Sequence, residues 1–160
     1  MKYFAILTVL ILIVTLVGVG YMYMNANIFV EAVGVIATEA QSQAALFDEL
    51  REQVRLGAVV GTPYVASQEL SGAENYQFLT YTVRLRNNCS VAADMVELQV
   101  TPMAGDILQI GSSVDVKLPA GQTVDATATI LTDVNMHSIR EVTVTYYIWG
   151  VPFTMKTTVR

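Results

Sequence analysis

The feature that most constrains this chain is its N-terminal segment, which has no charged side chain between Lys2 and Glu31. As a helix, the apolar run from Tyr3 to Met24 measures roughly 30 Å, which matches the hydrocarbon core of a bilayer. A secretory signal peptide has a shorter apolar region, of about 7–15 residues, followed by a small-x-small cleavage site. We therefore predict an uncleaved signal-anchor transmembrane helix over residues 1–27.

The residues that flank this span predict its orientation. Tyr21, Tyr23 and Phe29 lie where an interfacial belt of aromatic residues is expected. Lys2 and the amino terminus are positive, whereas the next positive residue after the span is Arg51. Because positive flanks stay in the cytoplasm, we expect a single-pass protein of the cell membrane with a cytoplasmic N-terminus and an extracytoplasmic C-terminal domain.

Charge and cysteine content exclude several other classes of protein. The net charge is −5, whereas nucleic-acid-binding surfaces need clustered Lys and Arg, so no nucleic-acid partner is expected. Cys89 is the single cysteine, so no internal disulfide framework can form, and we expect it to be a small buried apolar side chain. The length of the chain beyond the span suits one modest domain and a helix.

Apolar residues continue after the span with the spacing of a helix. This pattern predicts an amphipathic stalk helix over residues 28–57, with Gly57 as its stop and a seam of the coiled-coil type. The seam suits two roles, because it can pack on the protein's own β domain or meet copies of itself. Steps of four and three residues relate its eight positions, of which one is polar: Phe29, Val33, Ile36, Ala40, Gln43, Phe47, Leu50 and Val54.

From Ala58 to the C-terminus the period of the apolar residues changes to two, which is typical of strands with one buried face. The stretch YQFLTYTVRLR places Leu79, Tyr81, Val83 and Leu85 on one face. Similar alternation recurs, between turn sequences, in MVELQV, SVDVKL, TVDATATI, REVTVTYYI and FTMKTTV. Six or seven such strands predict an all-β, immunoglobulin-like sandwich over residues 58–160.

Three stretches of this region resemble small immunoglobulin-like extracytoplasmic modules: YTVRLRNNCSVAADMVELQVTP, VKLPAGQTVDATATI and EVTVTYYIWGVPFTMKTTV. They are most similar to the water-stress domain of late embryogenesis abundant proteins and to short lipoprotein or anchored domains of bacteria. The resemblance lies in the strand order and in LPAG before a strand, and RNNCS stands where the water-stress family commonly has Asn-Pro-Asn. It implies a binding or structural module without an active site.

The C-terminal stretch TVTYYIWGVPFTMKTTV predicts a hairpin with a four-residue connection. We pair Ile148 with Phe153, because Pro152 lacks an N–H and restrains Val151 toward extended geometry. This register then places three further pairs on the buried face, namely Tyr146 with Met155, Val144 with Thr157 and Val142 with Val159.

Tyr147 and Trp149 fall on the other, solvent-facing side of this hairpin, near Thr154 and Lys156. Two large aromatic side chains on a wet face need a cover. The stalk helix or the segment 58–66 of the same chain can supply it. Otherwise the two residues are a contact surface for a protein partner, since Trp and Tyr anchor interfaces.

No residue set in the sequence has the spacing of a catalytic or metal site. His137 is the single histidine, and a zinc site needs three or four ligands. A nucleophilic triad needs a histidine base, and nothing in the spacing joins His137 to Cys89 or to a serine. The acidic residues are scattered rather than grouped as in a calcium loop. We expect no enzyme activity, no cofactor and no small-molecule substrate.

These patterns lead to the hypothesis of a membrane-anchored extracytoplasmic binding or structural module without catalysis, in which a helical stalk presents a β-sandwich. The alternative is a pilin-like filament subunit, because a long N-terminal helix followed by a β head is typical of that class. We expect a protein partner, or self-association through the stalk helix. The candidate interaction residues are Tyr147, Trp149, Phe29, Val33, Ile36, Phe47, Leu50 and Val54.

Overall fold

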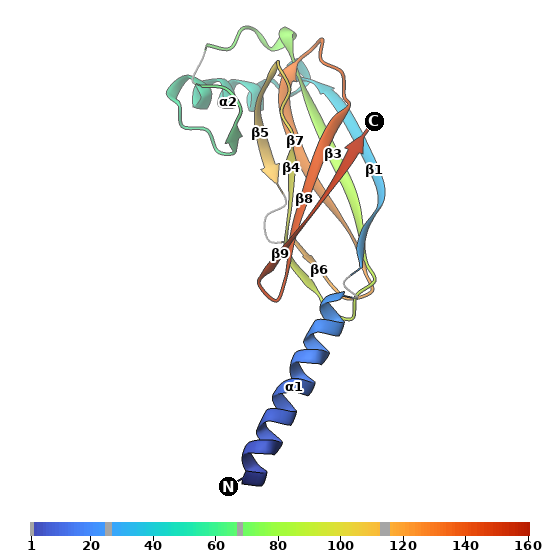
Figure 1. Ribbon diagram of the computed structural model, residues 1–160. Helices are drawn as coiled ribbons and strands as arrows, with labels where there is room; N and C mark the ends of the chain where they lie inside the picture. Colours follow the sequence, from blue (N-terminus) through green and yellow to red (C-terminus); the bar gives the residue numbers. More distant parts are fainter. Residues whose placement is uncertain (1, 25–26, 67–68, 113–115) are drawn as a thin grey trace.

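A computed structural model describes residues 2–24, 27–66, 69–112 and 116–160, and it contains an apolar helix and a β-sandwich (Figure 1). The helix α1 (Lys2–Met24) protrudes from one end of the sandwich. Its segment Tyr3–Tyr21 has a mean hydropathy of 2.6 and is not buried against the rest of the protein. This length and composition suit a membrane span, and an N-terminal signal sequence has the same properties.

The β region consists of two antiparallel sheets packed face to face, which confirms the predicted sandwich and is compatible with an immunoglobulin-like fold. One sheet has the strand order β1-β3-β7-β5-β2 and the other has the order β6-β4-β8-β9. The strands are β1 (Ile28–Glu39), β2 (Thr62–Pro63), β3 (Tyr76–Asn87), β4 (Ala93–Val100), β5 (Asp106–Ser112), β6 (Val116–Leu118), β7 (Thr123–Asp133), β8 (Arg140–Ile148) and β9 (Val151–Val159).

The main core lies between the sheets and follows the alternation of the sequence. On β3, the residues Leu79, Tyr81, Val83 and Leu85 are buried, as predicted, whereas the residues between them face outward or are partly exposed. The opposite sheet contributes every second residue of β4 from Val96 and of β8 from Val142 to the same core. Where the outer face of a sheet is open to solvent, the period of two in the sequence is clear.

The predicted stalk helix over residues 28–57 is wrong for its first half. Residues Ile28–Glu39 form β1, which pairs with β3 along its whole length, and Ala40–Gln43 form the short helix η1. Ile, Val and Phe fit a pleated surface well, and the pairing with β3 gives every residue of the strand except Glu31 a neighbour. The sandwich therefore begins at Ile28 rather than at Ala58.

Helix α2 (Ala44–Leu56) is the part of the predicted helix that forms, and it ends at the predicted stop. Gly57 is left-handed, with φ 66°, and the N–H groups of Gly57 and Ala58 donate to the carbonyls of Val54 and Gln53. This is the Schellman arrangement, which glycine adopts without steric cost. The helix lies near the end of the sandwich opposite α1 (Figure 1).

A second, smaller core lies between α2 and the outer face of the five-stranded sheet. Phe47, Leu50 and Val54 are each at most 3% exposed there. They belong to one cluster with Phe78 and Leu131 of the sheet. Of the two roles left open for the seam, its α2 part thus packs on the protein's own β domain.

The register predicted for the C-terminal hairpin is wrong by two residues. Ile148 pairs with Val151, so the connection contains only Trp149 and Gly150. Both residues have positive φ, 50° and 78°, as a type I′ turn requires. Pro152 is tolerated opposite Tyr147 because β9 is an edge strand, where a missing N–H need not break a ladder. A shift of two residues leaves the predicted faces unchanged.

Candidate interaction surface

The sandwich has two long edge strands, β1 in the five-stranded sheet and β9 in the four-stranded sheet. Among the described strands, β1 pairs only with β3, and β9 pairs only with β8. The opposite edges are β2 and β6, with two and three residues, which is too short to template another strand. A partner strand has therefore two places to add, β1 with its 12 residues and β9 with its 9 residues.

Strand β9 carries the residues that proteins use to protect an edge. Pro152 cannot donate a backbone hydrogen bond, and Lys156 places a charge on the strand, where its Nζ lies 2.8 Å from Glu141 Oε1. The side chains of β9 that face outward are polar apart from this proline. The edge of β9 is thus protected against pairing with a further strand.

Strand β1 lacks this protection over most of its length. The register slips between Val30 and Ala32, so Glu31 forms a bulge that separates the start of the strand from the rest. The remaining stretch, residues 32–38 with the sequence AVGVIAT, has neither a charge nor a proline. Uncharged, β-branched segments of this length pair readily with further strands when they are exposed. Residues 32–38 are called the open edge below.

The side chains around the open edge add an apolar surface to the free backbone. Ile36 is 66% exposed and points away from the core, since it pairs with the outward residue Thr80. Val33 pairs with buried Val83 and faces inward, but it is still 39% exposed on this edge strand. Phe29, before the bulge, is 38% exposed.

The start of β1 is fixed to the sandwich by the RNNCS stretch. The Asn27 N–H donates to Cys89 Sγ at 3.0 Å, and the Asn88 N–H donates to the Asn27 carbonyl at 3.0 Å. The buried Asn87 amide donates to the carbonyls of Val91 and Leu118 at 2.8 and 3.0 Å. Cys89 is buried and free, as expected from the sequence. The chain therefore enters the sandwich at a defined point.

At the other end of the sandwich, a buried ion pair joins the two sheets. Arg140 Nε and Nη2 donate to the Asp106 carboxylate at 3.0 and 2.8 Å, and both side chains are fully buried. Burial alone would raise the pKa of Asp106, but hydrogen bonds from Arg140, the Met103 N–H and Thr132 outweigh it and hold this pKa below its usual value. The remaining Arg140 donors bind the carbonyls of His137 and Ile139.

The buried Tyr81 and the half-buried Tyr64 complete this polar layer. Tyr81 Oη donates to the Ser138 carbonyl at 2.8 Å, and burial raises the pKa of Tyr81 to about 12. Tyr64 Oη lies 2.9 Å from the Val100 carbonyl and 2.8 Å from Gln109 Oε1, and burial raises its pKa further. Among the described residues, no buried side-chain nitrogen or oxygen lacks a hydrogen-bond partner. A network in which every group is satisfied rigidifies the core around it.

The candidate residues from the sequence separate into three groups. Phe47, Leu50 and Val54 are buried under α2 and are not available to a partner. Phe29, Val33 and Ile36 lie on β1, where they contribute the apolar surface of the open edge. The third group is the aromatic pair Tyr147 and Trp149 at the end of β8.

Neither cover that the same chain was expected to supply lies over Trp149, which is 56% exposed. Helix α2 packs on the other sheet, and the segment 58–66 pairs with β5 through Thr62 and Pro63. Tyr147 is half-buried opposite Pro152. The expectation of a cover from within the chain is therefore wrong for Trp149.

The described parts of the chain contain no group of three or more His, Cys, Asp or Glu side chains placed to hold a metal ion. An apolar hollow of about 220 Å³ lies between α2 and β5, and Val54, Pro63 and Ile107 contribute to its lining. The described residues that line this hollow carry no ionisable side chain.

Comparisons with known proteins give distant structural likenesses only. No protein-family model and no curated protein matches the chain. Among solved structures, the yeast GGA1 GAE domain is 12% identical, with a TM-score of 0.37, over 56% of this chain and 94% of that chain. A FixG-related protein from Vibrio parahaemolyticus is 10% identical, with a TM-score of 0.35, over 80% of this chain and 93% of that chain. Neither likeness identifies a family or a function.

Proposed function

We propose that this protein is a membrane-anchored, extracytoplasmic binding module without catalysis, and that it binds an extended segment of a protein partner by strand addition to β1. The observation that carries the proposal is the open edge, an unprotected run on the long edge strand nearest the anchor. Strand addition takes its affinity from main-chain hydrogen bonds and its selectivity from alternate side chains.

The position of β1 suits this role. The strand begins at Ile28, close behind the end of α1 at Met24. Twelve residues in a strand extend roughly 40 Å, so the edge rises away from the end of the sandwich that α1 reaches. A partner segment bound there lies along the side of the sandwich at a fixed height above the anchor.

Charge favours a different protein over a second copy of this chain. An antiparallel pair of β1 strands that overlaps fully over the open edge is centred on Val35, and it places Glu31 of each copy opposite Glu39 of the other. Like charges that face each other across strands are destabilising. A partner segment with apolar alternation and a basic residue near each end matches the same surface.

Hydrogen exchange of the full chain in lipid nanodiscs tests this proposal with a synthetic peptide as the probe. The peptide alternates Val and Thr between two terminal lysines, and a peptide with glutamate ends is its control. We expect the lysine peptide to slow amide exchange in the open edge and the glutamate peptide to have little effect. Unchanged β1 amides at saturating peptide concentrations would contradict strand addition.

A matched pair of variants locates the effect. Ile36→Lys places a charge on the open edge and should abolish the protection, because charged edge residues oppose pairing. Leu56→Lys is the control, since Leu56 is 63% exposed on α2 and Ile36 is 66% exposed on β1. Equal loss of peptide binding in both variants would show that the peptide binds elsewhere.

The alternative proposal, a pilin-like filament subunit, predicts a different outcome for the same sample. A filament subunit is recovered in sheared fibres, whereas an anchored module stays monodisperse in detergent. Concentration-dependent assembly that Ile36→Lys removes would favour pairing between copies over a separate partner.

A further inference from the structure

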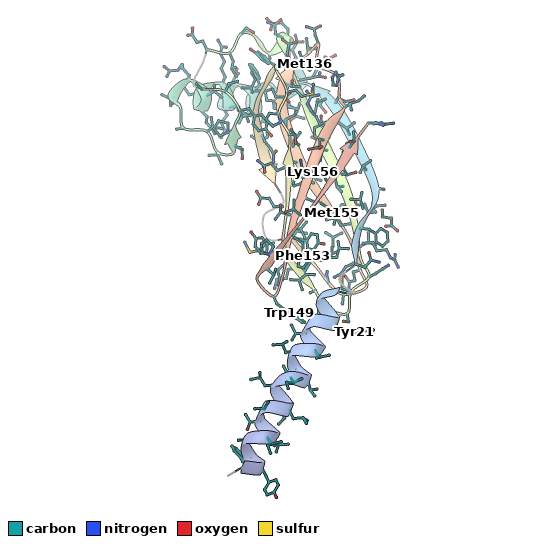
Figure 2. The ribbon with its side chains drawn as sticks, viewed as in Figure 1. Tyr21, Met136, Trp149, Phe153, Met155 and Lys156 are labelled. Atoms are coloured by element: carbon teal, nitrogen blue, oxygen red, sulfur yellow. The ribbon has the colours of Figure 1, made fainter. Side chains whose placement is uncertain are left out.

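The end of the sandwich that faces α1 carries a turn whose sequence is unusual. Trp149 and Gly150 form the two-residue turn between β8 and β9, and Figure 2 shows Trp149 at the end of the sandwich from which α1 protrudes. The first position of a type I′ turn favours Asn, Asp or Gly, because its φ is positive. Trp149 holds this position with φ 50°, which is uncommon for a bulky residue.

The exposed surface around this turn is apolar. Trp149 is 56% exposed, and Val151, the first residue of β9, is 41% exposed. On the neighbouring strand β4, Met95 is 50% exposed next to Asp94, which pairs with Tyr147. A strained, exposed tryptophan with apolar neighbours is an arrangement that needs a cover outside the chain.

The chain itself limits how far this end can lie from α1. Three residue steps connect Met24 to Asn27, and they span at most about 11 Å. Asn27 is held by hydrogen bonds with Cys89 and Asn88, in the loop between β3 and β4. The headgroup region on each side of a bilayer measures about 5–7 Å. When α1 spans a membrane, this end of the sandwich therefore lies at or next to the headgroup region.

Tryptophan is the side chain best suited to that depth. Its ring is apolar, its indole N–H can donate to a headgroup, and it is enriched at membrane–water interfaces. Lys117 of β6 is exposed beside Asp94 of β4, with 3.7 Å between its Nζ and Asp94 Oδ1, so a cation for lipid phosphates lies on the same sheet. The residues on this end thus combine an apolar tip with a polar surface that carries one positive and one negative side chain, Lys117 and Asp94.

We infer that the Trp149–Gly150 turn inserts into the lipid–water interface of the membrane that α1 spans, and that it thereby fixes how the sandwich is rotated about its anchor. The inference rests on the membrane anchorage of the proposed function. It assigns Trp149 to a lipid surface rather than to a protein partner. Because α1 and the turn then hold the sandwich at two points, the sandwich cannot rotate about α1. The direction that the open edge of β1 faces is thereby fixed as well.

Trp149 is the single tryptophan of the chain, so its fluorescence reports its own environment. The full chain is reconstituted in nanodiscs made with lipids that carry a quencher near the headgroup, and iodide is the quencher in water. We expect strong quenching by the lipid, weak quenching by iodide and a blue shift of the emission relative to the denatured chain.

A variant that moves the fluorophore is the control. In Trp149→Phe/Met103→Trp the tryptophan lies after β4, next to the Asp106 end of the sandwich, where Met103 is 45% exposed. We expect quenching by iodide and none by the lipid. Equal iodide quenching of both proteins, without lipid quenching of Trp149, would overturn the inference and leave the anchor intact. A wild-type chain that does not copurify with nanodiscs would overturn both the inference and the proposed anchorage.

Discussion

Replacing Asp106 by alanine should destabilise the sandwich strongly, because the change leaves a charge without a partner inside it. Arg140 would keep its bonds to the carbonyls of His137 and Ile139 but would lose both contacts with the carboxylate. Breaking a buried pair in this way costs about 3–5 kcal/mol. The free energy of unfolding of a domain is only about 5–15 kcal/mol, so roughly a fifth of it or more is at stake.

The double variant Asp106→Leu/Arg140→Met separates the ion pair from the packing. It removes both charges and keeps apolar volume, so we expect far less destabilisation than in Asp106→Ala, since such replacements are often neutral or stabilising by about 1–4 kcal/mol. Asp125→Ala is the control, because its pair with Arg84 has similar geometry but is about half exposed and contributes little. The assay is denaturant unfolding of the full chain in detergent, followed by far-ultraviolet circular dichroism.

The same pair predicts how stability depends on pH. The folded-state pKa of Asp106 is lowered, so its contribution is present above the unfolded pKa of about 3.9 and is lost as the pH falls through the folded value. Asp106→Asn should lack this loss below about pH 4. A cost of Asp106→Ala below about 1 kcal/mol, or a double variant as unstable as the single one, would refute the argument from buried charge.

Two further substitutions test the packing of α2 and the strain at the hairpin. Phe47→Ala should cost about 3–5 kcal/mol in buried packing, and hydrogen exchange should show this as loss of amide protection in α2 while β3 stays protected. The control Leu56→Ala, on the exposed face of α2, should change the protection little. Unchanged protection of α2 in Phe47→Ala would mean that the seam does not stabilise the packing of α2. In detergent, Trp149→Asn should raise the free energy of unfolding by about 1 kcal/mol, because Asn tolerates the left-handed conformation that penalises Trp. A lower stability of Trp149→Asn in denaturant titrations would mean that Trp149 packs on the sandwich.

The sequence predicted the sheets better than it predicted the first strand. In β3 a clean alternation identifies the buried face, because the outer face of that strand is polar from Thr80 to Arg86. In β1 the bulge at Glu31 breaks the alternation, and the steps from Phe29 to Val33 to Ile36 equally match a helix. The pairing with β3 decides between the two, and a partner strand so distant in the sequence is not visible from local pattern.

The hairpin and the candidate surface show the same limit of prediction from the local sequence pattern. Trp149 is an unusual residue for a type I′ turn, so the local sequence does not predict the two-residue turn. The alternation nevertheless predicts correctly which side chains of β8 and β9 share a face. A helical seam is the basis on which the sequence predicts interaction through Phe29, Val33 and Ile36, and these residues instead lie on a strand. Their exposure follows from the edge position of β1, which depends on the strand order of the whole sheet.

The way the chain enters and leaves the sandwich has a mechanical consequence. β1 starts at the end of the sandwich from which α1 protrudes, whereas β9 ends toward the other end, where Val159 pairs with Arg140. Tension between a membrane and a load attached to the C-terminus would act along the strands. The ladder between β1 and β3, from Ile28 opposite Asn87 to Glu39 opposite Gln77, would then be loaded in shear. Its hydrogen bonds would share the force and yield together, whereas a hairpin that is peeled from its open end loses them one at a time.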